Sequence, residues 1–177
     1  PKTQHSGRQA YGYDEDLTVE EVKADYLGLR QRARKMFAAL AFTPNRQSAL
    51  EMTEMERQRE FEKRWKQGGL TFQGVFSDFA ISREANEFAA EFVRQKIQQT
   101  VKNSVVAKAL VPTYTIGCKR LAVDTDYYKT YNRPNVTLVD VSKSPIERIT
   151  SAGVHALGRE YPLNSLIMAT GFDAMTG

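Results

Sequence analysis

The sequence has few of the residues that build cross-linked or metal-rich proteins. Its 177 residues include one cysteine, Cys118, and two histidines. An intramolecular disulfide framework and a cysteine-rich metal site are therefore excluded, and a reducing compartment is favoured. His5 and His155 lie far apart, without a neighbouring pair of carboxylates. No metal site is predicted.

The sequence also has only a small excess of positive charge and no long hydrophobic run. The formal net charge is +4, from 25 Lys and Arg against 21 Asp and Glu, and so small an excess does not indicate nucleic-acid binding. No apolar run approaches the ~20 residues that cross a bilayer. With 41% hydrophobic and 26% charged residues, the composition is that of a soluble folded chain.

Familiar catalytic signatures are missing as well. The sequence contains no Ser-His-Asp arrangement, HExxH, P-loop or GxGxxG pattern, so motifs alone indicate no enzyme. The chain starts at Pro1 without a leader-like segment and stops at Gly177, directly after a strand-like run. These ends predict an interior fragment of a longer protein. The missing leader and the lone cysteine predict a cytoplasmic location.

The first part of the chain has the periodicity of helices. Apolar side chains recur at spacings of three and four, which aligns them on one helical face. Helices are predicted from residue 18 to about 42–44, over 53–68 and 82–101, and, shorter, over 104–110. Thr18 with Glu21 and Thr53 with Glu56 fit capping boxes. The second helix carries basic residues that are expected to face water: Arg57, Arg59, Lys63 and Arg64.

The pattern changes at Pro112, after which strands and turns are predicted. Val136–Val141 alternates β-branched residues, Ile146–Thr150 and Val154–Leu157 flank a turn, and Leu166–Ala169 is typical of a short buried strand. This part has no crossover helix and too few strands to close a parallel sheet alone. The predicted domains are a mostly helical region, 1–111, and a β-rich region, 112–177.

The basic pair Lys119 and Arg120 is the first candidate binding segment. It follows the turn-forming Gly117 at the junction of the helical and β-rich parts. A planar guanidinium beside a compact ammonium suits a nucleotide phosphate or a developing anion. A solvated basic pair at the start of a strand is the alternative. The adjacent Cys118 has no candidate base nearby, which favours an inert side chain over a nucleophile.

The second candidate segment is Ala169–Asp173. It ends the last predicted strand with a glycine, which lets a ligand approach the backbone closely, and an acid just beyond it. Ligands of open α/β sheets bind outside the carboxyl ends of the strands, so a cofactor is expected here. The plainer alternative is a strand followed by a tight turn.

These segments occur in the order seen in Baeyer–Villiger monooxygenases. The second part resembles that family through Gly117–Leu121, Asp126–Tyr128, Tyr131–Val136, Leu138–Asp140, Pro145–Ile146 and Ala169–Ala174. The helical part resembles the insertion in the NADPH domain of the cyclohexanone and phenylacetone monooxygenase type, through Ser48–Leu50, Trp65–Gly69, Ala85–Glu87, Phe92–Arg94 and Lys96–Ile97. The resemblance covers nearly the whole chain.

The resemblance implies an α/β fold, a fragment of a flavoprotein with two dinucleotide-binding domains. Residues 1–111 correspond to a helical insertion of the NADPH-binding domain, and residues 112–177 to its β-rich end and the crossing back to the FAD domain. The implied full-length enzyme uses FAD, NADPH and O2 to insert one oxygen atom beside a ketone carbonyl, giving an ester or lactone. Its partners are the ketone, O2 and the remaining segments of both domains, with no nucleic acid and no membrane.

Roles for individual residues follow from the same resemblance. Arg120 matches the catalytic arginine, which stabilises the flavin peroxide and the following oxyanion and contacts the nicotinamide end of the cofactor. Lys119 matches a lysine that binds NADP, through the ribose 2′-phosphate. The return crossing to the FAD domain completes the implied cofactor-binding set: Ala169, Thr170, Gly171 and Asp173.

The sequence leaves two other functions open. A heteroatom-oxidising or N-hydroxylating flavin monooxygenase shares the Ala-Thr-Gly crossing. A non-enzymatic basic helical module is the other, although its basic residues Arg30, Arg32, Arg34 and Lys35 do not share one helical face. Both glycine-rich fingerprints of the family are missing from the sequence. The 177 residues alone are therefore expected neither to bind flavin nor to oxidise NADPH.

Overall fold

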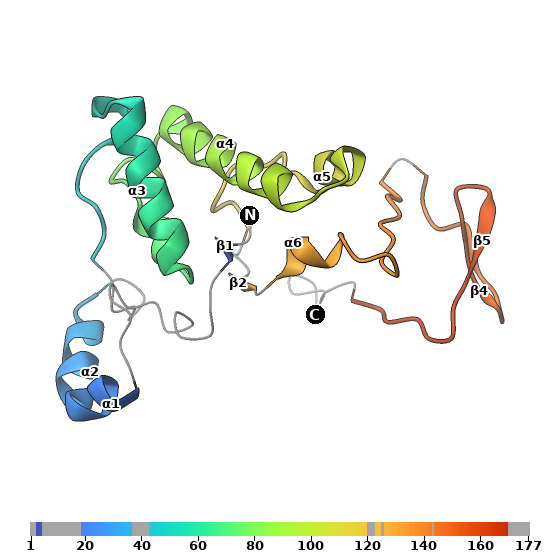
Figure 1. The fold of residues 1–177 in the computed structure, drawn as a ribbon, viewed down its shortest axis with the longest axis horizontal. Helices are drawn as coiled ribbons and strands as arrows, with labels where there is room; N and C mark the ends of the chain where they lie inside the picture. Colours follow the sequence, from blue (N-terminus) through green and yellow to red (C-terminus); the bar gives the residue numbers. More distant parts are fainter. Residues whose placement is uncertain are drawn as a thin grey trace, which may run out of the picture. The chain divides into compact units, whose positions relative to one another are not determined.

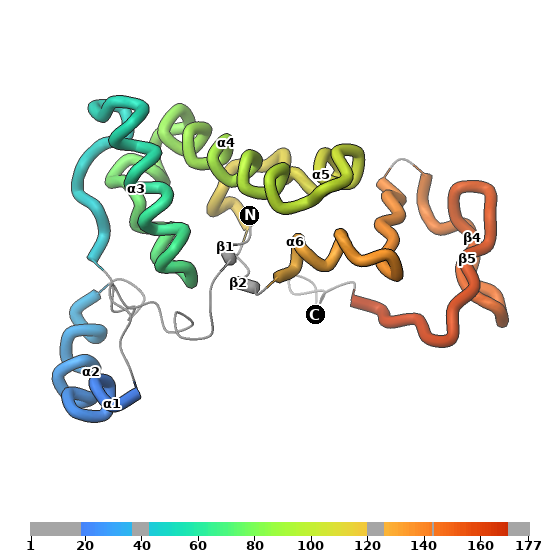
Figure 2. The backbone as a smooth tube through the Cα atoms, viewed as in Figure 1, coloured from blue at the N-terminus to red at the C-terminus, as the bar shows by residue number. Residues whose placement is uncertain are grey.

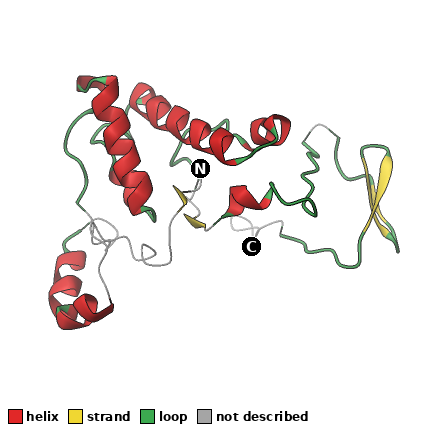
Figure 3. Ribbon diagram, in the orientation of Figure 1, coloured by secondary structure: helices red, strands yellow, loops and turns green. Residues whose placement is uncertain are grey.

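The computed structural model describes residues 3–4, 19–36, 43–119, 123–124, 126–142 and 144–169. The chain divides into two compact units, residues 1–136 and 137–177. Figure 3 shows helices in the first unit and a small sheet in the second. No helix in the described ranges is both long and apolar enough to cross a bilayer.

The longest helices of the first unit are α3 (Glu54–Gln67) and α4 (Arg83–Thr100) (Figure 1). They pack against each other through aromatic side chains. Phe61 of α3 stacks on Phe92 of α4 with ring centroids 5.1 Å apart. Phe72, from the turn between the helices, lies 6.0 Å from Phe92. All three rings are buried. Because aromatic rings bury large apolar areas, this cluster is the centre of the core.

The boundaries of α3 and α4 agree with the predicted helix ranges, 53–68 and 82–101. α3 begins after Thr53, whose side chain and that of Glu56 form the predicted capping box. It ends at Gly68, which has a φ of +68°. α4 begins after Ser82, whose hydroxyl accepts a hydrogen bond from the Ala85 N–H. Both predicted helices are confirmed.

Shorter elements complete the first unit. The predicted helix over residues 104–110 is confirmed and is capped by Asn103, whose side chain accepts from two backbone amides. The strands β1 and β2 pair in parallel, Thr3 opposite Val123. The shorter elements are η3 (Ala49–Glu51), η4 (Thr71–Gly74), α5 (Ser104–Leu110), α6 (Tyr127–Thr130), β1 (Thr3–Gln4) and β2 (Val123–Asp124). Figure 2 follows the backbone through the helical ones.

The helix predicted from residue 18 to about 42–44 is wrong as one element. The structure has α1 (Val19–Ala24) and α2 (Tyr26–Arg34), separated by Asp25 with φ −125° and ψ 37°. Aspartate competes with helical hydrogen bonding through its side chain, and the Asp25 carboxylate accepts from Arg32. The predicted apolar face is only partly buried, because Tyr26 is 53% exposed. Residues 18 and 37–42 lie outside the described ranges.

The second unit contains an antiparallel sheet of β3 (Arg148–Ile149), β4 (Gly153–Ala156) and β5 (Arg159–Pro162). The predicted hairpin around residues 151–153 is confirmed, since Ile149 pairs with Val154. β5 was not predicted, because its residues do not alternate between apolar and polar. Its pairing with β4 follows a tight turn at Leu157 and Gly158, both with positive φ.

Two predicted strands are wrong. Neither Val136–Val141 nor Leu166–Ala169 forms a strand, and the second run is exposed rather than buried, with Ile167 87% exposed. A strand requires a neighbour that satisfies its backbone N–H and C=O groups. Neither run pairs with another strand among the described residues. The first run also spans the division between the units, after Val136. The division after Val136 differs from the predicted domain boundary between residues 111 and 112, and the assignment of domains 1–111 and 112–177 stays a prediction.

Candidate functional site

Lys119 follows a tight turn that leaves the helical core. The Cys118 N–H donates to the Thr115 C=O at 3.2 Å, and Gly117 has a φ of +92°. This left-handed conformation, which a type II turn requires at its third residue, is one that glycine adopts without strain. Lys119 is exposed, and its Nζ lies 4.9 Å from the centroid of the Tyr114 ring. The turn thus presents an ammonium group at the surface of the first unit.

Two contacts fix this turn to the core. Ile116, which precedes Gly117, is 4% exposed and belongs to the hydrophobic cluster. Asn86 of α4, also 4% exposed, binds both backbone groups of Ile116. Its Nδ2 donates to the Ile116 C=O at 3.0 Å, and its Oδ1 accepts from the Ile116 N–H at 3.0 Å. Asn86 Nδ2 also donates to the Phe79 C=O at 3.1 Å.

The charge of Lys119 suits an anionic ligand. Among the ion pairs of the described residues none includes Lys119. An exposed ammonium without a carboxylate neighbour binds phosphate as a compact point charge. Cys118 beside it is an exposed free thiol. No group of three His, Cys, Asp or Glu side chains in the described ranges could hold a metal ion.

The other predicted site residues are described only in part. Ala169 is exposed and belongs to the second unit, whereas Lys119 belongs to the first. Arg120 lies outside the described residues, as do Thr170, Gly171 and Asp173. The roles assigned to these residues stay predictions.

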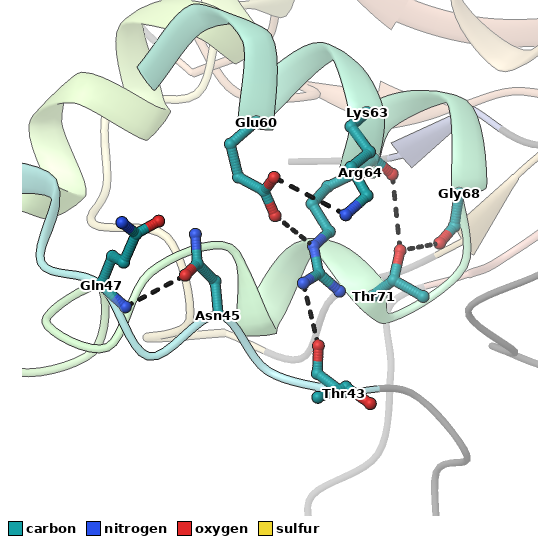
Figure 4. A network of polar contacts seen from close by, with 8 residues as sticks. All are labelled: Thr43, Asn45, Gln47, Glu60, Lys63, Arg64, Gly68 and Thr71. Carbon is teal, nitrogen blue, oxygen red and sulfur yellow. Dashed lines mark hydrogen bonds and ion pairs between the residues drawn. The ribbon is translucent and has the colours of Figure 1, made fainter. Parts of the chain in front are cut away.

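A buried arginine on α3 is a feature that the sequence reasoning missed. Arg64 was expected to face water, but its side chain is only 5% exposed. Its Nε donates to Glu60 Oε1 at 2.8 Å and its Nη2 to the Thr43 C=O at 2.9 Å (Figure 4). Two features of the sequence could have indicated this burial. Arg64 comes three residues after the apolar Phe61, which places both on one helical face, and the carboxylate of Glu60 lies four residues before it.

This arginine borders a groove of about 540 Å³ between residues 43–47 and α3. The helix contributes Glu60, Lys63, Arg64 and Gln67. The lining also includes Arg46, so basic residues outnumber the one acidic residue. Beyond the groove lining, Thr71 Oγ1 donates to the Gly68 C=O at 2.6 Å, just after the end of α3 (Figure 4). The Lys119 turn does not contribute to this lining.

Comparison with known proteins relates the chain to a group of flavin enzymes. No family model matches it. A Baeyer–Villiger monooxygenase of Pseudooceanicola batsensis is 39% identical over 166 residues, which are 92% of this chain and 30% of that protein. A phenazine N-monooxygenase of Lysobacter antibioticus is 40% identical over 162 residues, 90% of this chain and 30% of that protein. The chain thus spans about 30% of the length of these curated relatives.

Solved structures agree with this relationship. A steroid monooxygenase bound to NADP matches with a TM-score of 0.83 and 40% identity, over 89% of this chain and 30% of that one. OTEMO in complex with FAD and NADP matches with a TM-score of 0.83 and 35% identity, over 91% of this chain and 31% of that one. The chain, with its helical first unit and the small sheet of its second unit, thus matches a segment of FAD- and NADP-bound monooxygenase structures.

Proposed function

The chain belongs to the Baeyer–Villiger monooxygenase family, and from that premise we propose that it forms part of an FAD- and NADPH-dependent enzyme that inserts one oxygen atom of O2 beside a ketone carbonyl. The proposal is supported by relatives that match about 90% of this chain and by similar structures solved with both cofactors. The remaining segments of the FAD and NADPH domains are its expected partners. The lone cysteine supports a cytoplasmic location.

The observation that carries this proposal is the fixed turn that presents Lys119. Its ammonium group is exposed and has no ion-pair partner among the described residues. The turn holds it to the core through Ile116. These properties fit a residue that binds the phosphate of NADP as a point charge. The adjacent Arg120 would then stabilise the anion that develops during oxygen insertion.

FAD and NADPH, when bound, supply the reducing equivalents and the activation of O2. In this proposal, the residues of this chain bind and orient them. Lys119 holds the anionic end of the nicotinamide cofactor and Arg120 its reacting end. Residues 1–111 form the helical insertion of the NADPH-binding domain, and residues 112–177 its β-rich end. Ala169–Asp173 form the cofactor-binding crossing back to the FAD domain.

Ketone-dependent oxygenation by the full-length enzyme tests the proposal. Cyclic and linear ketones are offered with NADPH and 18O2, and the products are identified by mass spectrometry. The expected result is an ester or lactone that carries one labelled oxygen atom. Phenazine is tested as a second substrate, because one relative is named for the N-oxidation of phenazine. Labelled N-oxide without ester or lactone would replace ketone oxidation as the function, and no labelled product would overturn the oxygenase proposal.

Substitutions then assign the two basic residues. Lys119→Ala should raise the Kd for NADP⁺ about tenfold or more, the size of a lost charge-assisted interaction. Arg120→Ala should abolish product formation while FAD remains bound. The matched control is Lys108→Ala, which removes an exposed lysine from α5 and should change neither quantity. Normal product formation by Arg120→Ala would remove this arginine from the mechanism.

A further inference from the structure

We propose that Asn86 of α4 is a positioning residue for NADP binding, acting through the backbone of Ile116 on Lys119. The inference rests on the proposed function, because it assigns Asn86 to the positioning of Lys119. Asn86 lies 30 positions before Ile116 in the sequence. The two are joined by a pair of hydrogen bonds inside the core.

The two hydrogen bonds between Asn86 and Ile116 resemble those between the backbones of two neighbouring strands. A side-chain amide offers a donor and an acceptor side by side, as a backbone peptide does. Asn86 uses both on the same residue, at 3.0 Å to the Ile116 C=O and 3.0 Å from its N–H. One hydrogen bond would leave this backbone free to rotate about it. Two bonds, to the N–H and to the C=O of Ile116, fix its orientation as well as its position.

The orientation of Ile116 sets the direction of the chain that follows. Lys119 lies three residues further on, and three residues of extended chain reach roughly 10 Å. The turn between them contains Gly117, whose φ of +92° is accessible to glycine without strain. A rotation at Ile116 therefore displaces the Lys119 ammonium group. Misplacing a binding or catalytic group by ~1 Å is enough to change rates and affinities strongly.

Burial explains why an amide holds this place. Asn86 follows Ala85 on the buried face of α4, where Ala89 and Phe92 are also buried. An apolar residue would fill such a position without the cost of burying a polar group. The Asn86 amide group instead binds only backbone outside α4 in its described contacts, at Phe79 and Ile116. The side chain thus joins two loops at the base of the Lys119 turn.

The variant Asn86→Asp tests this role in the full-length flavoenzyme. It keeps the shape of the side chain and the acceptor for the Ile116 N–H but removes the amide donor that both carbonyl groups use. The matched control is Thr71→Val in the same unit, which removes a buried hydroxyl whose hydrogen bonds go to Gly68 and Arg64 and not to the Lys119 turn. The readouts are the Kd for NADP⁺ by titration calorimetry, KM for NADPH against kcat, FAD content and the melting temperature.

The expected result separates positioning from stability. Asn86→Asp should raise the Kd for NADP⁺ about tenfold, the effect of a misplaced charge-assisted contact, and should raise the KM for NADPH. Thr71→Val should lower the melting temperature without changing the Kd. If the Kd for NADP⁺ of Asn86→Asp equals that of Thr71→Val, the proposal is overturned. Where Asn86→Asp yields no folded enzyme, Asn86→Ala, which buries no charge, takes its place with the same expected Kd.

The double variant with Lys119→Ala distinguishes the two proposals. If Asn86 acts through Lys119, Asn86→Asp should add little to the Kd of the Lys119→Ala enzyme. Full additivity would overturn the positioning role and leave the cofactor role of Lys119 intact. Unchanged NADP⁺ binding by Lys119→Ala alone would instead overturn the proposed cofactor site, and the role of Asn86 with it.

Discussion

Asp78 binds the backbone of Ala49, 29 positions earlier in the sequence, through a 2.9 Å hydrogen bond from the Ala49 N–H to its Oδ1. Its other oxygen accepts from the Ser48 hydroxyl at 2.5 Å and from the Leu50 N–H at 3.3 Å. The carboxylate thereby ties the loop before α4 to η3, which precedes α3. One side chain thus holds together the segments that precede the two long helices.

Removing this carboxylate should destabilise the protein. Asp78→Asn keeps the volume but loses the charge and one acceptor, and hydrogen bonds to charged groups contribute about 1.5–3 kcal/mol each. A decrease of about 2 kcal/mol in the free energy of unfolding is expected near neutral pH. Chemical denaturation measures it. Ser48→Ala, which removes a single donor, should cost less than Asp78→Asn; an equal or larger cost would contradict this account.

The stability that Asp78 provides should depend on pH. Burial raises the pKa of Asp78, but the hydrogen bonds from Ser48, Ala49 and Leu50 outweigh it and hold the pKa below its ordinary 3.8. A lowered folded-state pKa means that the contribution is present above pH 3.8 and is lost as the pH falls through the folded-state value. Denaturation curves between about pH 5 and pH 2 should therefore converge for the wild type and Asp78→Asn.

Titration of Tyr131 provides a second pH test. Burial of Tyr131 and its hydrogen bond to the Tyr127 hydroxyl, at 3.0 Å, raise its pKa from 10.0 to about 12. The unfolded chain then ionises first, so the contribution to stability is complete below pH 10.0 and is lost as the pH rises toward 12. Tyr127→Phe should lower the Tyr131 pKa only in part, because burial remains.

NMR of ring-labelled tyrosine measures this shift. The Tyr131 resonance of Tyr127→Phe should titrate between the ordinary tyrosine value and that of the wild type. Tyr161→Phe, in the second unit, is the control and should leave the Tyr131 curve unchanged. A Tyr131 curve that does not move in Tyr127→Phe would show that the hydroxyl contact has no part in the shift.

Local features of the helices were predictable, and distant contacts were not. The capping box of Thr53 and Glu56 is contained within four residues, so the start of α3 followed from the sequence. The burial of Arg64 depends on the Thr43 carbonyl, 21 positions away, which no periodicity indicates. Leu166–Ala169 has the composition of a strand, but strand formation also requires a partner.

The candidate site shows the same division. Lys119 and Arg120 are predicted site residues because their basic pair follows a glycine turn within an ordered set of motifs that resembles one family. Asn86 stands in one of these motifs, yet its role could not be inferred. Its partner Ile116 is 30 positions further on, and only the folded chain brings them together.

The ion pair between Arg64 and Glu60 should be costly to break on one side only. Arg64→Met removes the donors to Glu60 and to the Thr43 C=O and leaves a carboxylate that is 16% exposed without this partner. Breaking one side of such a pair costs about 3–5 kcal/mol when fully buried, so a loss of about 2–3 kcal/mol is expected here. The double variant Arg64→Met with Glu60→Met should recover part of it, as thermal unfolding will show. A double variant no more stable than Arg64→Met alone would contradict the pairing.

Gly153 and Gly158 of the second unit are required for different reasons, the first because a side chain would clash and the second because of its backbone conformation. A Cβ at Gly153 would lie 2.0 Å from the Tyr161 carbonyl oxygen across the β4–β5 pair, so Gly153→Ala should break the strand pairing. A Cβ at Gly158 would meet nothing within 4 Å, and only its φ of +72° disfavours a side chain. Gly158→Ala should thus cost about 1–2 kcal/mol and keep the sheet. Amide hydrogen exchange at Val154 and Tyr161, which face each other in the β4–β5 register, reports the outcome. Fast exchange in Gly153→Ala with protection kept in Gly158→Ala is expected, and protection in both would show that β4 tolerates the methyl group.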